Sequence, residues 1–416
     1  MDVLESSKAR LRATVSLTKE LASGDFPHTH SRDALLQIAA LFDSGLKQLE
    51  TLTAVSDPAI IRALASAQSR KLFDLYPLLG ILLRSTDVRN AFEIHGPFLR
   101  IVRKLLGPAS KLVISSEWDF SPFTFLPPTV YGLTDTVFIG GPASEAANVL
   151  LVPLSGHELG HNVWAKEKRG DQLGPALATE ILRYLKTVRW SEFSSHFTQL
   201  AKPDDLEDLL GEQTWAPAWE SALRQSEEMF CDLIGLGIFR EAYLYAFSYL
   251  IAPGLPYRRS YDYPGSKMRA TYLVQAATAY GIRIPNDYAD RFEDEAVPTD
   301  QPDKILLETA DHAVMNLMPT LIGAADTSIV RAGIQPSTDE QVEANVRCLA
   351  QCVPAVNAAG FPSIINAAWR FHLSGMQVWK DRYRDLANSE HRCLGLLNDL
   401  VLKSVEVFEI EQRQQP

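Results

Sequence analysis

A mainly α-helical fold, with a small β element between helical lobes, is predicted by three observations. Apolar residues recur at a helical spacing along residues 1–106 and again along 304–411. Two short runs rich in β-branched and aromatic residues, at 111–115 and 136–140, lie between these stretches. A pair of histidines four residues apart follows the second run, a spacing that suits one face of a helix. We therefore expect a helical protein whose chemistry lies in its central part.

Residues 1–106 are expected to form a helical lobe. One helix begins near Asp33, and its apolar positions have a helical period: Leu35, Ile38, Phe42, Leu46 and Leu49. A second helix opens at Asp57-Pro58 and is kinked or restarted by Pro77. We interpret this lobe as packing on the central part of the chain; a bundle that binds a protein partner is the alternative.

The histidine pair belongs to the stretch His157-Glu158-Leu-Gly-His161. Residues four apart on a helix lie about 6 Å apart along the axis, so both imidazoles face the same way. One Zn²⁺ can then bind both ring nitrogens at roughly 2.0–2.1 Å. Glu158 adjoins the first ligand, where it can hold and deprotonate a water molecule that the metal activates.

Two acidic residues interrupt a later apolar helix, which we expect to run from about Trp219 to Leu250. Glu228 and Asp232 share one face of this helix because they are also four residues apart. Acidic side chains in apolar surroundings need a partner, and a metal supplies one. Glu228 would complete a His₂Glu catalytic site, and Asp232 would accept the other ring N–H of a ligand histidine.

The pattern formed by His157, Glu158 and His161, and then Glu228 and Asp232, resembles that of the gluzincin zinc metallopeptidases. It is most similar to the branch that contains HtpX and the CAAX prenyl endopeptidases. In that branch a His-Pro pair and an Arg follow the acidic helix. The resemblance covers roughly residues 136–275 and implies a zincin-like core that hydrolyses peptide bonds.

Residues 260–269 occupy the place of the His-Pro and Arg element. Pro264 and Arg269 match that branch, whereas Tyr263 stands where it has His. The resemblance therefore implies catalytic roles for Tyr263 and Arg269 beside Glu158. Tyr257, Arg258, Arg259 and Tyr261 precede them, and such a loop can stabilise an oxyanion. The alternative is a surface loop that merely carries these side chains.

Gluzincins pair an extended substrate with an edge strand just before the metal helix. The resemblance thus makes residues 136–140 the candidate edge of the cleft, with Val137, Phe138 and Ile139 as substrate-binding residues. A small structural hairpin is the alternative. Residues 162–227 separate the second histidine from Glu228, and this Trp-containing insertion is either a lid over the site or a structural insertion.

The last part of the chain is expected to be a second helical lobe. Residues 291–303 are acidic and contain proline, which predicts a linker. Helical patterns follow at 304–318, 338–352, 363–387 and 389–411, and prolines such as Pro319 mark the breaks. We therefore expect three parts: an N-terminal helical lobe at 1–106, a zincin-like catalytic domain at 107–290 and a C-terminal helical lobe at 291–416.

The 416 residues carry a net charge of −11, which argues against nucleic acid or anionic lipid as the main partner. Four cysteines are too few for a disulfide framework. No signal peptide and no run of about 20 predominantly apolar residues is evident, so we expect a cytoplasmic protein without a membrane span.

These features together predict a zinc metalloendopeptidase that acts on a peptide or protein substrate. Two other functions fit the same residues. One is a metal-loaded but inactive scaffold that uses its helical lobes to bind partners. The other is a regulator whose rare cleavage of one partner acts as a switch, with the insertion at 162–227 closing the site.

Overall fold

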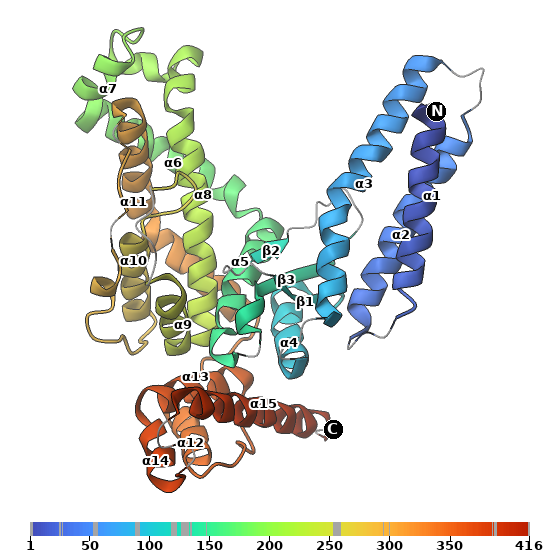
Figure 1. Ribbon diagram of the computed structural model, residues 1–416. Helices are drawn as coiled ribbons and strands as arrows, with labels where there is room; N and C mark the ends of the chain where they lie inside the picture. The colour runs from blue at the N-terminus through green and yellow to red at the C-terminus, as the bar shows by residue number, and fades with distance from the viewer. Residues whose placement is uncertain are drawn as a thin grey trace. The chain divides into compact units, whose positions relative to one another are not determined.

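The computed structural model describes residues 3–24, 26, 28–52, 57–87, 92–117, 123–125, 133, 135–146, 148–252, 259–293, 295–298, 300–384, 386 and 389–414. The protein is mainly α-helical with one small sheet, as predicted (Figure 1). The chain forms two compact units. The first contains residues 1–103 and 107–148, and the second contains residues 104–106 and 149–416.

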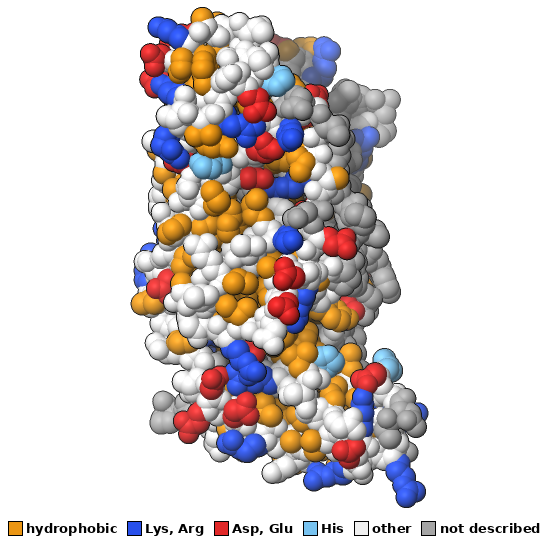
Figure 2. Space-filling model, turned by 90° about the vertical axis from the view of Figure 1, so that its left-hand side faces the viewer, with side chains coloured by type: hydrophobic (Ala, Val, Ile, Leu, Met, Phe, Trp, Pro, Cys, Tyr) orange, Lys and Arg blue, Asp and Glu red, His pale blue; other side chains and the backbone are white. Residues whose placement is uncertain are grey.

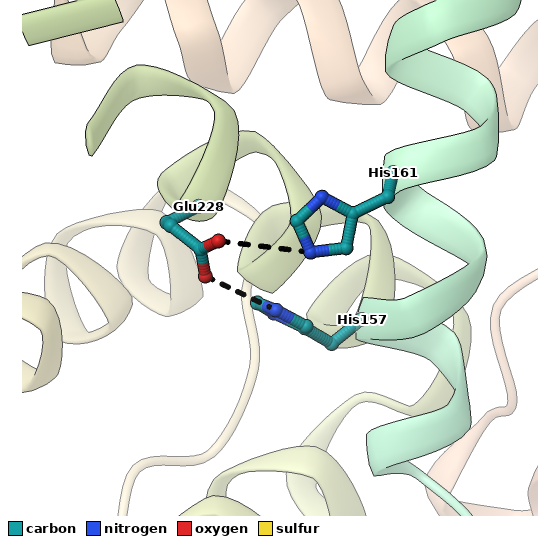
Figure 3. A group of neighbouring side chains, drawn as sticks. All are labelled: His157, His161 and Glu228. Atoms are coloured by element: carbon teal, nitrogen blue, oxygen red, sulfur yellow. Dashed lines mark ion pairs between the residues drawn. The ribbon is translucent and has the colours of Figure 1, made fainter. Parts of the chain in front are cut away.

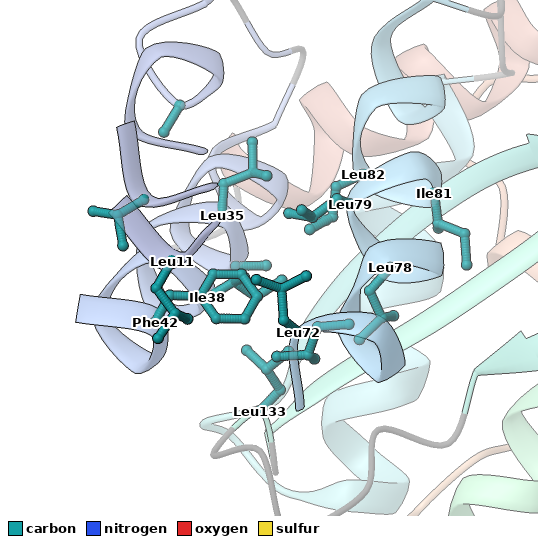
Figure 4. Packing of buried hydrophobic residues seen from close by; sticks show 14 of the residues in the cluster. Leu11, Leu35, Ile38, Phe42, Leu72, Leu78, Leu79, Ile81, Leu82 and Leu133 are labelled. Carbon is teal, nitrogen blue, oxygen red and sulfur yellow. The ribbon is translucent and has the colours of Figure 1, made fainter. Parts of the chain in front are cut away.

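Three long helices make up most of the first unit: α1 (Val3–Leu21), α2 (Thr29–Glu50) and α3 (Pro58–Asp87). The predicted apolar period is confirmed for α2, because its five predicted positions are all buried. Figure 4 shows how side chains from these helices meet in one core, among them Leu35, Phe42 and Leu72. Pro77 lies inside α3, which continues past it. The short helix η1 (Phe92–Ile94) and α4 (His95–Leu106) follow.

The sheet contains β1 (Lys111–Glu117), β2 (Phe123–Phe125) and β3 (Thr136–Pro142) in the order β1-β3-β2. β1 is parallel and β2 antiparallel to β3. The prediction that residues 136–140 form an edge strand is therefore wrong. The three-residue strand β2, which lies between β1 and β3 in the sequence, pairs with the other side of β3, and so short a strand leaves little pattern in the sequence.

The predicted substrate contact of Val137, Phe138 and Ile139 loses its backbone argument for the same reason. Phe138 and Ile139 have strand partners on both sides, and Val137 pairs with Leu112. All three side chains are buried within the first unit. No open row of N–H and C=O groups remains at Phe138 and Ile139 for an extended peptide.

The second unit is built around α5 (Leu154–Glu167) and α8 (Leu209–Phe239), which pack against each other. α6 (Arg169–Tyr184) and α11 (Gln301–Arg331) pack along α8. A π-helical turn (Leu185–Arg189) joins α6 to α7 (Trp190–His196). α9 (Glu241–Ile251) and α10 (Ser266–Ala279) complete the part shown beside α8 in Figure 1.

The helix predicted from Trp219 to Leu250 is two helices, α8 and α9. Arg240 separates them with a φ of 56°, a conformation that ends a helix and that non-glycine residues seldom adopt. The side chain of Asn366 accepts a hydrogen bond from the backbone N–H of Ala242 and so satisfies a donor at the start of α9. This partner comes from far along the chain, so the local pattern contained no sign of the break.

The C-terminal helices are α12 (Asp339–Ala350), α13 (Phe361–Ser374), α14 (Met376–Arg382) and α15 (Glu390–Gln414). α13 packs on α8 and α9. The helix predicted at 363–387 is divided at Gly375 into α13 and α14. The break predicted at Pro319 is absent, because α11 continues through that residue.

The two units differ from the three predicted parts. Val113 of β1 and Phe138 of β3 share the core of the N-terminal helices, so residues 107–148 belong with that unit. α11 packs on α8, so residues from 291 onward belong with α5 and α8. Pro108 and the acidic segment at 291–303 mark changes of secondary structure, whereas units are defined by shared cores.

Within the part of the chain that the structure describes, one helix is long and apolar enough to cross a membrane: residues 302–331 of α11. Buried core helices meet the same criterion, and α11 packs along α8 and α6. On the face of the molecule shown in Figure 2, apolar side chains are interspersed with acidic and basic ones.

Candidate metal centre

Small residues bring α5 and α8 close together. A Cβ atom added to Gly160 would lie 2.6 Å from the Cα atom of Cys231, and one added to Gly156 would lie 2.9 Å from the Cα atom of Gly235. Real Cβ atoms do not approach a neighbour so closely, so larger residues would separate the helices. The close packing places the two histidines of α5 beside Glu228 of α8.

The three predicted metal ligands converge (Figure 3). Glu228 Oε2 lies 3.3 Å from His157 Nε2, and Glu228 Oε1 lies 3.7 Å from His161 Nε2. The candidate ligand atoms of the three residues all lie within 4.8 Å of one another. Ligands of a tetrahedral metal with bonds of about 2.0–2.1 Å are roughly 3.3–3.5 Å apart. The spacing therefore suits one metal ion.

A carboxylate holds the far nitrogen of each histidine. His157 Nδ1 donates to Asp232 Oδ1 at 2.8 Å, as predicted, and His161 Nδ1 donates to Glu227 Oε1 at 3.0 Å. With hydrogens on both Nδ1 atoms, both Nε2 lone pairs point toward Glu228. Glu228 Oε2 is buried and has no hydrogen-bond partner. A buried carboxylate whose two oxygens face two imidazole lone pairs is an arrangement that a cation stabilises, so this group can hold a metal ion.

Asp232 is the centre of a buried polar network. Arg269 donates to both of its carboxylate oxygens, at 2.9 and 2.8 Å, and the Tyr243 hydroxyl donates to Oδ1 at 2.7 Å. Burial opposes the charge of Asp232, but Arg269 and His157 outweigh burial and hold the pKa of this carboxyl well below its usual range. Asp232 therefore remains a carboxylate, the form that accepts the hydrogen bond from His157 Nδ1.

His157 is also affected by these charges. Burial lowers its pKa, but the neighbouring carboxylates of Asp232 and Glu228 outweigh burial and raise the pKa to about 10. A proton therefore competes with a metal ion for His157 Nε2, and metal binding should release a proton. The affinity for the metal should fall as the pH is lowered.

Glu158 is buried on α5 next to His157. Burial raises its pKa above the usual value, and the neighbouring His157 and His161 act in the opposite direction. A carboxyl group with a raised pKa is a better proton acceptor in its ionised form than a solvent-exposed one. Glu158 thus lies beside the candidate ligands, as predicted, in surroundings that suit a general base.

Arg269 lies at the site, as predicted, and its guanidinium binds Asp232 and lies 3.9 Å from Glu228. Its Nε and Nη2 atoms face Asp232, and its guanidinium lies 5.0 Å from the centre of the Phe247 ring. Its side chain is largely buried. These contacts make Arg269 a residue that positions Asp232; a direct catalytic role stays a prediction.

Tyr263 lies in the loop before α10, with 47% of its surface exposed. Its ring centre is 5.9 Å from the guanidinium carbon of Arg269. The negative charge of Glu228 raises the pKa of Tyr263, and burial adds to this effect. The hydroxyl therefore keeps its proton and can act as a hydrogen-bond donor. Tyr257 and Arg258 of the same predicted loop lie outside the described residues.

Two tryptophans of the insertion at 162–227 have structural partners. Trp219 Nε1 donates to the carbonyl of Gly174 at 3.0 Å, and Trp215 Nε1 donates to the carbonyl of Leu206 at 3.0 Å. These bonds tie the insertion to α8. The structure therefore favours the structural insertion over the lid for this segment.

Two residues of the site were not assigned a role from the sequence. Glu227 precedes Glu228 and thus points about 100° away from the helix face shared by Glu228 and Asp232. Tyr243 approaches Asp232 because the chain turns at Arg240 and because Gly235 leaves room for the Tyr243 ring. The sequence signal for Glu227 was an acidic residue directly beside the predicted third ligand. No such signal in the sequence pointed to Tyr243.

No protein-family model, curated protein or solved structure matches the chain. The resemblance to the gluzincins therefore depends on the motif residues themselves.

Proposed function

We propose that the protein is a zinc-dependent metallopeptidase of the gluzincin type, with a zincin-like core built on α5 and α8. The observation that carries the proposal is the convergence of His157, His161 and Glu228, with a carboxylate on the far nitrogen of each histidine. A purely structural metal site would not require Glu158, a further buried carboxyl group beside the ligands.

Zinc fits this set of donors. Two imidazole nitrogens and one carboxylate are the protein ligands of catalytic zinc sites that leave a position open. When bound, zinc would polarise the scissile carbonyl and lower the pKa of water toward about 7. The donor set therefore supports zinc as the resident metal.

The remaining residues have separate tasks in the proposed reaction. Glu158 takes the proton of the attacking water and later gives it to the leaving amine. Tyr263 donates a hydrogen bond to the substrate oxygen as negative charge develops there. Asp232 and Glu227 keep the histidines in the orientation needed for binding, and Arg269 holds Asp232.

A mixed peptide library tests the proposal. The purified protein should cleave peptides, a chelator should abolish cleavage, and added Zn²⁺ should restore it. Glu228→Ala should lack both zinc and activity. Glu220→Ala, which removes an exposed carboxylate from the same helix, should retain both.

Two results would contradict the proposal. Cleavage that is insensitive to the chelator would remove the metal from the reaction. A protein that holds one zinc per chain and cleaves nothing would instead favour a metal-bearing scaffold.

A further inference from the structure

Buried polar contacts fasten the loop at 259–265 to α11. The Arg259 side chain is 5% exposed, and its Nη2 atom donates to Asp311 Oδ1 on α11 at 2.5 Å. Its Nη1 atom donates to the carbonyl of Ser260 at 3.1 Å. The planar guanidinium of Arg259 thus joins the start of the loop to α11. Its two hydrogen bonds diverge in a fixed geometry that a lysine ammonium group cannot reproduce.

The same loop is fastened to α8. The Ser221 hydroxyl donates to the carbonyl of Tyr261 at 2.6 Å, and Gln225 Nε2 donates to Ser221 Oγ at 3.1 Å. Gln225 also makes a hydrogen bond with Asp311. Ser221 and Gln225 lie one turn apart on the helix face that continues to Glu228. The face that presents the third ligand therefore also fixes the loop.

Contacts at both ends hold the loop. The backbone N–H of Arg259 donates to the carbonyl of Ala296 at 3.0 Å. The backbone N–H of Ser266 donates to Glu295 Oε1 at 2.9 Å, where the carboxylate also interacts favourably with the start of α10. These contacts define where the backbone of Tyr263 can lie.

Tyr263 itself has little packing to hold it. Its side chain is half-exposed, and its ring contact is with Arg269. The position of its hydroxyl therefore depends on the backbone of the loop. A buried ion pair contributes little net stability but fixes geometry, because both of its members must stay paired.

We propose that Arg259, held by Asp311, is a positioning residue that sets the Tyr263 hydroxyl toward the substrate carbonyl at the metal centre. The inference rests on the proposed peptidase function. It assigns a task to a buried ion pair that makes no contact with the three metal ligands. Its effect on hydrolysis should pass through Tyr263 alone.

A double-mutant cycle tests this dependence in the zinc-loaded, full-length protein. Arg259→Lys and Tyr263→Phe should each lower kcat by about 10–10³-fold, with KM changed less than about threefold and zinc content unchanged. The double variant should be no slower than Tyr263→Phe. Arg189→Lys is the matched control, because Arg189 binds Glu308 on the same helix as Asp311 and should leave kcat unchanged.

Hydrogen exchange gives a second readout that needs no activity. Arg259→Lys should speed backbone exchange in residues 259–266, and Arg189→Lys should not. The inference is overturned if the losses in kcat multiply in the double variant, or if Arg259→Lys keeps the wild-type kcat.

The same set of proteins separates the two levels of the account. If Tyr263→Phe is fully active and Glu158→Gln is inactive, the positioning role fails and the peptidase function stands. If Glu158→Gln is fully active, the peptidase function itself fails, and the positioning role fails with it.

Discussion

Two substitutions distinguish the orientation of the ligand histidines from the neutralisation of the buried Arg269 charge. Asp232 and Glu227 each hold the Nδ1 atom of one histidine. Asp232 also binds two donor atoms of the buried Arg269, whereas Glu227 pairs with Arg224, which is 67% exposed and lies 3.5 Å away. Asp232→Asn and Glu227→Gln should therefore differ in their effect on stability and agree in their effect on the metal.

The magnitudes follow from these contacts. Loss of the carboxylate behind a ligand histidine weakens metal binding by about 10–100-fold, which is about 1.4–2.7 kcal/mol for either substitution. Asp232→Asn in addition removes the nearer counter-charge of the buried Arg269 and leaves it with Glu228, 3.9 Å away, which costs up to about 3–5 kcal/mol of folding free energy. Glu227→Gln removes an ion pair with the exposed Arg224, worth less than about 1 kcal/mol.

Two assays measure the two effects. Competition with a chromophoric chelator gives the zinc affinity. Urea unfolding of the metal-free proteins gives the stability without the contribution of bound metal. Equal unfolding free energies for the two variants would refute the reasoning about Arg269. A crystal structure with Asp232 bound directly to zinc would refute its assignment as an orienting residue.

Two further predictions concern the packing of the helices and the pH. Gly160→Ala should destabilise the protein by about 1–3 kcal/mol and weaken zinc binding, because its Cβ would meet the backbone of Cys231. Gly323→Ala, where a Cβ meets nothing within 4 Å, should be neutral or stabilising in the same urea-unfolding assay. Burial, and then the nearby His28, lower the pKa of His95 from 6.5 to about 4, so the unfolded chain binds the extra proton first as the pH falls. Up to about 3 kcal/mol of stability, fully present above pH 6.5, should thus be lost toward pH 4, and the pH dependence of urea unfolding should be weaker in His95→Gln.

The pairing of the candidate site residues within each helix was predictable because it depends on helical spacing alone. His157 and His161, and likewise Glu228 and Asp232, lie four residues apart on continuous helices, so each pair shares a face whatever surrounds it. Tyr243 was not predictable in this way. It reaches Asp232 across a break at Arg240, and a tertiary partner supports that break.

The parts of the fold that were predictable are likewise those that depend on the local sequence pattern. The period of the apolar residues in α2 identified its buried face, because that period follows from the helix itself. The position of β3 within the sheet depends on β2, whose three residues carry no pattern of their own. Pro319 predicts the end of a helix, but α11 continues through this residue and packs along α8. For β3 and α11 a contact distant in sequence decided the outcome.

The rate of peptide hydrolysis by zinc-loaded Glu158→Gln tests the central claim most directly. Gln has nearly the same shape as Glu and is not one of the three converging ligands, so the variant should keep one zinc per chain. It cannot accept the proton of the attacking water or return it to the leaving amine. We therefore predict a loss of at least about 10²–10⁴-fold in kcat, measured on a peptide that the wild-type protein cleaves. Hydrolysis at the wild-type rate, with zinc retained, would contradict the proposed peptidase mechanism.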